Sequence, residues 1–464
     1  MTFRKLFLLS LVLILASCRG AEIADTAKQD PDAAQNTDNV GSEEQTLAEA
    51  GEPHVTPHVP AGRTLVVLGQ AVEPPVTASM SDYTEHLGVT PAGFMFYLIM
   101  SGDLERTRSE LATIATFMDR YPGTVLQLGL GYGPELTQNI KESGLLLAGF
   151  FDAELDAIGE WLKSRDHAIF LRTLYEFDRI GGTYGPPELY KPAYRYIVDN
   201  LRGKDLTNTA YVWHSAGPFV RTFDESGIYG GLSVTQLDLL TQTYGISPVY
   251  DLTPIADYYP GEGYVDYFAI SYWGDGNGYT GRSPESYRDL YEQETRRLLR
   301  EARELGLELM IGESTPWYIG TFSGEDSVEW FDGYFRLIEE FDIRMTSLIV
   351  AEWGAEGGNW GNTNGAFPAD ARIHPYPEVA ERWLRGISPS RYVSLRDVCP
   401  QAQANGNCDV RRMNTLLGIA PQTERLTWSA PIEPMRTQLR WPNCPPPLLP
   451  GTGGWCLPVL PSTD

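Results

Sequence analysis

Residues 167–217 read HAIFLRTLYEFDRIGGTYGPPELYKPAYRYIVDNLRGKDLTNTAYVWHSAG, and this stretch decides the fold. An apolar run (167–177) is followed by a helical pattern (187–203) and then by a second apolar run (209–216). Neither run alternates between apolar and polar residues as a half-exposed hairpin strand would, so both are expected to be strands that are covered on two faces. Two such strands separated by a helix predict a parallel sheet flanked by helices.

The same rhythm continues on both sides of this stretch. Six more apolar, β-branched or aromatic runs begin at Thr64, Ala92, Thr124, Val265, Leu307 and Thr346. Helical patterns lie between the runs, most clearly at 152–166, 283–306 and 325–342, and the second of these starts with Ser-Pro and ends at Gly306. Eight strand and helix units in this order predict a (β/α)8 TIM barrel, whose functional groups lie at the C-terminal ends of the strands.

An open, doubly wound sheet is the alternative architecture. Such a sheet normally carries a glycine-rich phosphate loop after its first strand. Here the corresponding residues 69–77 read GQAVEPPVT, which offers no cluster of glycine amides. Nucleotide binding is therefore not expected. No metal or other cofactor is expected either, because His86, His167 and His374 have no metal-ligand spacing.

The composition narrows the choice of partners. The 464 residues include 36 basic and 61 acidic side chains, which gives a net charge of −25. A surface of this sign repels phosphate backbones, so no nucleic-acid partner is expected. The chain also has 11 Trp and 25 Tyr, more than a core of this size needs. Flat rings in excess are suited to stacking on the apolar faces of sugars.

The first residues predict an exported protein. Residues 1–17 have a basic start, an apolar run from Leu6 to Leu15 and small residues at their end, as a lipoprotein signal peptide does. The apolar run is shorter than the ~20 residues of a membrane-spanning helix. The LASC ending resembles the lipobox of bacterial lipoproteins, in which Cys18 becomes the lipidated first residue. We therefore expect a protein that is lipid-anchored to a bacterial membrane. It is also expected to be a monomer.

A tether is expected to follow the anchor. Residues 18–60 hold nine acidic residues against Arg19 and Lys28, with almost no large apolar side chain. Such a segment repels itself and cannot bury enough apolar surface to fold, so disorder is predicted. The catalytic barrel is then expected to occupy residues 61–388.

Residues 389–464 are expected to form a small extension rich in proline and cysteine. Two local disulfides, 399 with 408 and 444 with 456, are the economical pairing, although four cysteines allow three pairings. A zinc site fits less well, because this region has no CxxC spacing and no histidine. A disulfide-stapled appendage is therefore predicted.

Two carboxylates stand out among the residues at the predicted strand ends. Glu176 and Glu313 each follow a run that should be buried, and strands four and seven lie across the barrel mouth from one another. Two carboxyl groups that face one cleft are the minimum equipment for cleaving a glycosidic bond. One carboxyl group would be protonated and give its proton to the departing oxygen. The other would be ionised and attack the anomeric carbon. Arg172, on the same strand face as Glu176, is expected to hold a carboxylate ionised or to bind a sugar hydroxyl.

At these residues the sequence resembles glycoside hydrolase family 26, the retaining β-mannanase family. The resemblance covers roughly residues 64–385. Its most specific carriers are LRTLYE (171–176), YVWHSAG (211–217), YYPGEGYVDYFAISYWG (258–274) and MIGEST (310–315). The resemblance implies that Glu176 is the acid/base and Glu313 the nucleophile. It also implies that Tyr272 lies near the nucleophile and that Trp353 forms a floor under the sugar.

Two departures from the family bear on the substrate. The family usually has histidine just before the acid/base, where this chain has Tyr175, and a tryptophan-rich stretch just after it, where this chain has RIGGTYG (179–185). The resemblance implies β-1,4-mannan, and these departures leave another β-glycan, xylan or glucan, as an alternative. The expected substrate-binding residues are Arg172, Tyr175, Trp213, His214, Tyr272, Trp273, Trp317 and Trp353.

A function of another class is a surface lipoprotein that binds a glycan without cleaving it. Such a receptor would keep the barrel cleft but would not need both carboxylates. Because Glu176 and Glu313 are both present, a hydrolase acting on a β-linked polysaccharide or oligosaccharide is the favoured interpretation.

Overall fold

The computed structural model describes most of residues 56–419 and two short strands near the C-terminus. The described ranges are 56–60, 62–69, 76–132, 136–178, 184–217, 255–273, 284–315, 324–351, 371–399, 411–419, 448–450 and 456–458. The expected signal peptide with Cys18, most of the tether, Trp317 and Trp353 lie outside these ranges.

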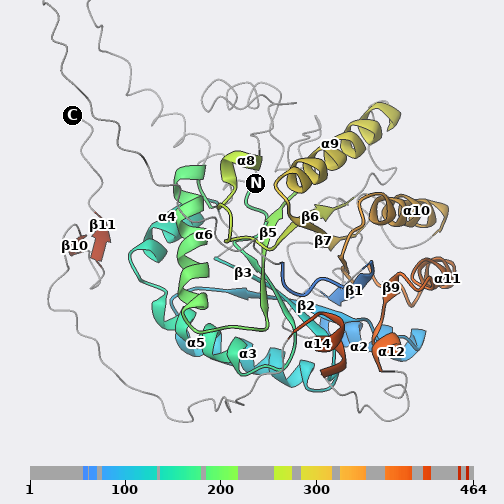
Figure 1. Ribbon diagram of the computed structural model, residues 1–464, viewed down its shortest axis with the longest axis horizontal. Helices are drawn as coiled ribbons and strands as arrows, with labels where there is room; N and C mark the ends of the chain where they lie inside the picture. The colour runs from blue at the N-terminus through green and yellow to red at the C-terminus, as the bar shows by residue number, and fades with distance from the viewer. Residues whose placement is uncertain are drawn as a thin grey trace, which may run out of the picture. The chain divides into compact units, whose positions relative to one another are not determined.

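Eight parallel strands close into a barrel, as the sequence predicts (Figure 1). They are β1 (Thr64–Gly69), β2 (Gly93–Ile99), β3 (Val125–Gly131), β4 (Ile169–Thr173), β5 (Thr209–Ser215), β6 (Tyr267–Tyr272), β7 (Glu308–Ser314) and β8 (Met345–Leu348). Each strand pairs in parallel with the next, and β8 pairs with β1 through Leu65 opposite Met345. Almost every strand residue is buried, because the barrel interior covers one face and the helices cover the other.

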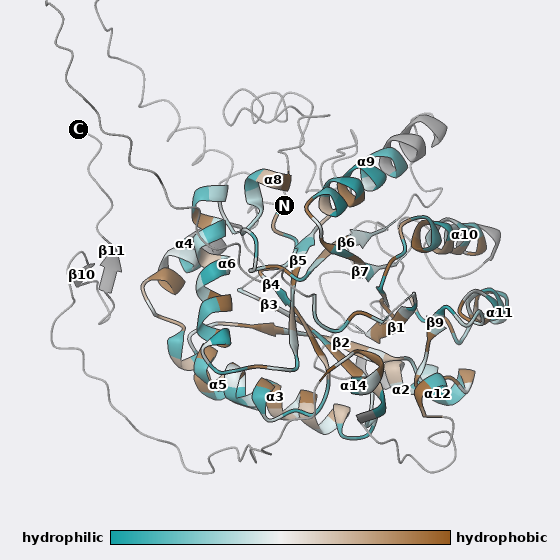
Figure 2. Ribbon diagram, in the orientation of Figure 1, coloured by the Kyte–Doolittle hydropathy of each residue, from teal (hydrophilic) through white to brown (hydrophobic). Residues whose placement is uncertain are grey.

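Helices surround the barrel (Figure 1). They are α2 (Val76–Leu87), α3 (Leu104–Met118), α4 (Leu136–Leu147), α5 (Asp152–Lys163), α6 (Pro187–Arg202), α8 (Ile255–Tyr258), α9 (Pro284–Glu304), α10 (Gly324–Glu340), α11 (Pro377–Gly386), α12 (Leu395–Val398) and α14 (Arg411–Leu416). Helices such as α3 and α5 carry both apolar and polar residues (Figure 2). Their buried residues are mostly apolar, as expected of helices that lie between a sheet and water. No helix in the described ranges is long and apolar enough to cross a membrane.

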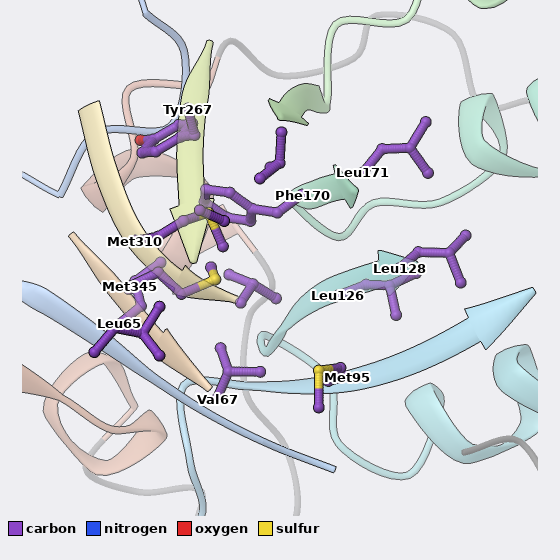
Figure 3. Close-up of a cluster of buried hydrophobic side chains, with 14 of the residues drawn as sticks. Leu65, Val67, Met95, Leu126, Leu128, Phe170, Leu171, Tyr267, Met310 and Met345 are labelled. Carbon is purple, nitrogen blue, oxygen red and sulfur yellow. The ribbon is translucent and has the colours of Figure 1, made fainter. Parts of the chain in front are cut away.

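The lower level of the barrel interior, which we call the floor, is apolar. Figure 3 shows Phe170, Met310 and Met345 pointing toward one another between the strands. The aromatic ring of Tyr267 meets that of Phe170 edge to face, with 5.4 Å between the ring centroids. Close packing of such side chains is the main source of stability in a barrel of this kind.

His58 completes the floor from below. It lies just before β1, is 2% exposed, and its ring packs edge to face on Phe170 at 5.5 Å. Burial lowers the pKa of His58 to about 4, although the nearby charge of Asp266 acts in the opposite direction. The imidazole is therefore neutral at pH 7.

A ninth strand, β9 (Tyr392–Val393), extends the sheet beside β1. It pairs in parallel with Thr64 and Leu65, and the Thr64 amide donates to the Arg391 carbonyl at 2.8 Å. The Arg63 side chain donates to the Ser390 carbonyl at 3.1 Å. The first residues of the expected C-terminal extension therefore belong to the barrel sheet.

The extension itself is described only in part. Cys399 is disulfide-bonded, and Cys408 and Cys444 lie outside the described ranges, so the pairing of the four cysteines stays a prediction. Near the C-terminus, β10 (Leu448–Pro450) and β11 (Cys456–Pro458) form an antiparallel pair.

Candidate active site

The upper level of the barrel interior, which we call the mouth, begins with a buried arginine on β4. Arg172 lies two residues beyond Phe170, so its side chain also points into the barrel, and it is fully buried. In the sheet it stands beside Gly129 of β3, which stands beside Tyr97 of β2. A Cβ at Gly129 would lie 2.8 Å from the Tyr97 ring and 3.1 Å from the guanidinium. The missing side chain thus makes room for the arginine.

Two tyrosine rings lie against this arginine. The guanidinium carbon lies 5.0 Å from the centroid of Tyr97 and 5.2 Å from that of Tyr175. Both distances are in the range of cation–π attraction. The two rings are 5.3 Å apart and tilted. Arg172 is therefore held in one orientation before any ligand arrives.

Glu313 of β7 is the charge partner of Arg172. Nη1 of the arginine donates to Oε1 of the glutamate at 2.5 Å, and the carboxylate is only 6% exposed. Burial raises the pKa of Glu313, the positive charge of Arg172 lowers it, and the negative charge of Glu176 raises it, so the net shift is upward. Glu176 is therefore close enough for its charge to act on Glu313.

His214 of β5 lies beside the arginine. Its Nδ1 is 3.1 Å from Nη1 of Arg172, and its ring is fully buried. The ring occupies the place that a side chain at Gly312 would need, since a Cβ there would come within 2.9 Å of Nε2. The Tyr175 ring stacks on the imidazole, at 6.4 Å between centroids. Gly312 and Tyr175 thus both lie against the imidazole ring.

Ser271 of β6 connects His214 to the second carboxylate. Its Oγ is 3.1 Å from Nε2 of His214 and donates to Oε1 of Glu176 at 2.7 Å. Glu176 is 4% exposed. The two glutamates predicted from the sequence thus belong to one buried cluster, with Arg172, His214 and Ser271 between them.

The backbone after β4 turns sharply to bring Glu176 over the mouth. Leu174 and Glu176 have φ values of 46° and 55°, in the left-handed region that side chains rarely adopt. Asp178 holds this turn, because its carboxylate accepts from the Ser215 hydroxyl at 2.6 Å and from the Ala216 amide at 2.7 Å. The strained turn is therefore fastened to the end of β5. Strain of this kind is common at functional sites.

Two residues expected to bind substrate lie elsewhere. The Trp213 indole is fully buried and stacks on Phe177 at 4.9 Å and 12°, on the side of β5 opposite His214. The Tyr272 hydroxyl donates to Glu292 of α9 at 2.9 Å, and its ring packs on α10. Both side chains fill the layer between sheet and helices, because side chains alternate along a strand. The expectation that Tyr272 lies beside the nucleophile is corrected accordingly.

Trp273 follows β6 and is also buried, and its carbonyl accepts a hydrogen bond from the indole of Trp330. Of the remaining expected substrate-binding residues, Arg172, Tyr175 and His214 belong to the cluster. Trp317 and Trp353 lie outside the described ranges, so their roles stay predictions.

Sequence reasoning missed Tyr97, Ser271 and Gly129. Tyr97 lies against Arg172, the charge partner of Glu313. The signal that would have found Tyr97 and Ser271 is parity, since each lies an even number of residues beyond an inward floor residue, Met95 and Tyr267. No group of three or more His, Cys, Asp or Glu in the described part of the chain is arranged to hold a metal ion.

Comparison with known proteins gives relatives of one enzyme class. No family model matches the chain. The β-1,3-xylanase TXYA of a Vibrio species is 22% identical over 380 residues, which cover 76% of this chain and 70% of the relative. A β-1,3-xylanase of an Alcaligenes species is 21% identical over 365 residues, which cover 72% of this chain and 66% of the relative. This chain is similar to glycoside hydrolases.

Solved structures that are similar to the chain include family 26 enzymes. A Cellulomonas fimi endo-β-1,4-mannanase double mutant has 17% identity and a TM-score of 0.47, with 73% of each chain covered. A family 26 β-mannanase from Bacteroides ovatus has 11% identity and a TM-score of 0.45, with 73% of this chain and 92% of that chain covered.

Proposed function

We propose that this protein is a retaining glycoside hydrolase that cleaves a β-linked polysaccharide. The observation that carries the proposal is the buried cluster at the strand ends, in which Glu176 and Glu313 from β4 and β7 are joined through polar side chains. Two carboxyl groups in one such cluster supply the acid and the nucleophile of glycosidic bond cleavage.

In the first step Glu313 acts as the nucleophile. Arg172 holds it ionised and fixes the oxygen that points away from the arginine toward the sugar. The carboxylate attacks the anomeric carbon while the glycosidic C–O bond breaks. Glu176 gives its proton to the departing oxygen, and a glycosyl ester on Glu313 forms.

In the second step Glu176 acts as the base. It removes a proton from a water molecule, which attacks the anomeric carbon and breaks the ester. The sugar leaves with its original configuration, Glu313 is again ionised and Glu176 is again protonated. Because burial raises the pKa of Glu313, activity is lost on acidification at a higher pH than an exposed glutamate would give.

For the glycan, β-1,3-xylan is the first substrate proposed. Both curated relatives are β-1,3-xylanases by name, and each aligns with more than 70% of this chain. Tyr175 stands where mannanases of family 26 usually have histidine, and it lies against both Arg172 and His214. The β-1,4-mannan implied by the motif resemblance is the second substrate to test.

A substrate panel tests this proposal. The full chain is incubated with β-1,3-xylan, β-1,4-mannan, β-1,4-xylan and mixed-linkage glucan, and new reducing ends are measured. Release from β-1,3-xylan, with the β-anomer appearing first by NMR, is the expected result. Release from mannan alone would replace the substrate and keep the chemistry. Binding without release from every glycan would select the receptor function instead.

Chemical rescue identifies the nucleophile. Glu313→Ala is expected to be inactive and to regain turnover of an activated aryl glycoside when azide is added. The product is expected to be the glycosyl azide of inverted configuration, because azide fills the space of the missing carboxylate. A product of retained configuration would contradict the assignment of Glu313.

We also propose that Cys18 carries a lipid that anchors the enzyme to a bacterial membrane. The lipobox-like LASC sequence and the acidic segment that follows it support this location. Wild-type protein is expected to enter the detergent phase in a phase-partition assay after expression in bacteria, and Cys18→Ala is expected to stay in the aqueous phase. Equal partitioning of both would contradict the anchor.

A further inference from the structure

A continuous path of four hydrogen bonds joins the two carboxylates of the mouth. It runs from Glu313 to Arg172 (2.5 Å), on to Nδ1 of His214 (3.1 Å), then from Nε2 of His214 to Ser271 (3.1 Å), and ends at Glu176 (2.7 Å). All five side chains are buried. A path of this length in a dry interior has few ways to place its protons.

The arginine fixes the direction of every bond in the path. A guanidinium has only donors, and the Glu313 carboxylate raises the pKa of Arg172 above its ordinary value although burial acts against this. Nδ1 of His214 must therefore accept from Arg172 and carry no proton. The imidazole is then neutral, and its proton lies on Nε2, which donates to the Ser271 oxygen. The hydroxyl proton of Ser271 is left for Oε1 of Glu176.

We propose that His214 and Ser271 are positioning residues for Glu176. The Ser271 hydroxyl can donate a hydrogen bond to the Glu176 carboxylate but cannot accept one from it. The proposal rests on the function proposed above and extends it to residues that do not touch the reacting atoms. A donor of fixed direction favours the ionised carboxylate of Glu176, which is the form needed in the second step. It also confines the proton of the acid form to Oε2.

The surroundings of His214 keep the path in this state. Among the described residues, the charged and titratable groups that face it include Arg172 from β4 and Tyr175 from the turn after β4. Glu313 of β7 lies behind the arginine, Tyr97 of β2 lies against it, and Glu176 lies beyond Ser271. The ring already occupies the space beside Gly312 that a Cβ would fill. Protonation of Nδ1 would set two donors, Nδ1–H and the guanidinium N–H, against each other, which favours the neutral ring.

The pH profile of kcat/KM tests the inference on the full chain with β-1,3-xylan. Ser271→Ala removes the donor to ionised Glu176, so the alkaline limb, which reports the catalytic acid, is expected to move up by about one pH unit. Ser271→Thr keeps the hydroxyl and is expected to stay within a few tenths of a unit of wild type. A Ser271→Ala limb that does not move would overturn the proposal, whatever happens to kcat.

The histidine is tested by a matched pair of variants. His214→Phe keeps a ring over Gly312 but leaves the serine able to accept from protonated Glu176, so the limb is expected to move up by less than in Ser271→Ala. His214→Gln offers an acceptor to Arg172 and a donor to Ser271, and is expected to bring the limb back toward wild type. A larger shift with glutamine than with phenylalanine would contradict the role of His214.

An NMR measurement separates this inference from the proposed function. In full-length chain labelled with 15N-histidine, the His214 signals, assigned by their loss in His214→Gln, are expected to show the neutral Nε2–H tautomer from pH 5 to 9. A protonated ring or an Nδ1–H tautomer would overturn the inference. If the tautomer is found but no glycan is cleaved, the proposed function fails and the direction of the hydrogen bonds stands.

Discussion

The floor and the mouth of the barrel are built by the same strands, and only two residues along each strand separate them. On β4 the inward side chain changes from Phe170 to Arg172, and on β7 it changes from Met310 to Gly312. The floor fills its space with apolar volume, which stabilises the sheet. The mouth leaves space at glycines and fills it with charges, whose burial is costly unless they are paired. Stability and chemistry therefore occupy adjacent levels, and substitutions should separate them.

The largest effect is expected at the mouth. Glu176→Gln and Glu313→Gln should each lower kcat/KM at least about 10⁴-fold, since neither amide can act as acid, base or nucleophile. Circular dichroism should show that both variants stay folded. Activity above about one per cent of wild type in either variant would contradict its catalytic role.

A third buried glutamate provides the matched control. Glu154 of α5 is 2% exposed and accepts hydrogen bonds from the Gly102 amide at 2.8 Å and the Thr107 hydroxyl at 2.6 Å. It lies in the helix layer and has no part in the cluster. Glu154→Gln is expected to lower the free energy of unfolding by about 1–3 kcal/mol while the folded protein keeps its kcat.

The reverse pattern is expected at the floor. Phe170→Ala should lower the free energy of unfolding by about 3–5 kcal/mol, because it opens a cavity between His58, Tyr267 and the methionines of the floor. The folded fraction should keep kcat within a few-fold, which urea unfolding and active-site titration can check together. A loss of kcat without a loss of stability would show that the two levels are not separate.

His58 gives the floor a pH dependence of its own. Its pKa is lowered to about 4 in the folded state from 6.5, so the stability that it contributes is fully present above pH 6.5 and is lost as the pH falls through 4. Between pH 7 and 4 the wild type should therefore lose about 3 kcal/mol more than His58→Phe does. Urea unfolding at several pH values measures this difference, and parallel curves for the two proteins would contradict it.

The smallest effect concerns the space around the arginine. Gly129→Ala would place a methyl group against Arg172 and Tyr97, and is expected to lower stability by about 1–3 kcal/mol and to lower kcat/KM by displacing Glu313. A methyl group at Gly144 of α4 would have no neighbouring atom within 4 Å, so Gly144→Ala should instead stabilise the protein by about 0.5–1 kcal/mol. Equal behaviour of the two variants would mean that crowding at Gly129 is relieved by movement.

The barrel was predictable because a strand that is buried on both faces appears in the sequence as a continuous apolar run. All eight apolar runs form strands, and the four clearest helical patterns form α5, α6, α9 and α10. Strand β4 ends at Thr173, earlier than the apolar run predicts. The reason is the left-handed backbone at Leu174 and Glu176. Neither leucine nor glutamate favours this conformation, so the sequence does not predict it.

The candidate site was predictable at the level of strand ends but not of strand faces. Arg172, His214 and Glu313 lie on the inward face and meet as expected. Trp213 and Tyr272 lie on the opposite face, next to inward residues. Tyr272 follows the inward Ser271 directly, so the alternation of side chains along β6 places it on the outer face. On β7 the pairing with β6 skips Gly312, an irregularity just before Glu313 that the sequence does not show.

The pairing of β9 with β1 has a consequence for how the chain is made. Residue 64 leaves the ribosome more than three hundred residues before residue 392, its partner in the sheet. The Thr64 amide at the start of β1 therefore meets its acceptor, the Arg391 carbonyl, only after residue 391 has been made, although Val67–Gly69 pair with β2 much earlier. A nascent chain that stalls before Tyr392 would leave the start of β1 without this partner, and an unpaired strand end can pair with other chains.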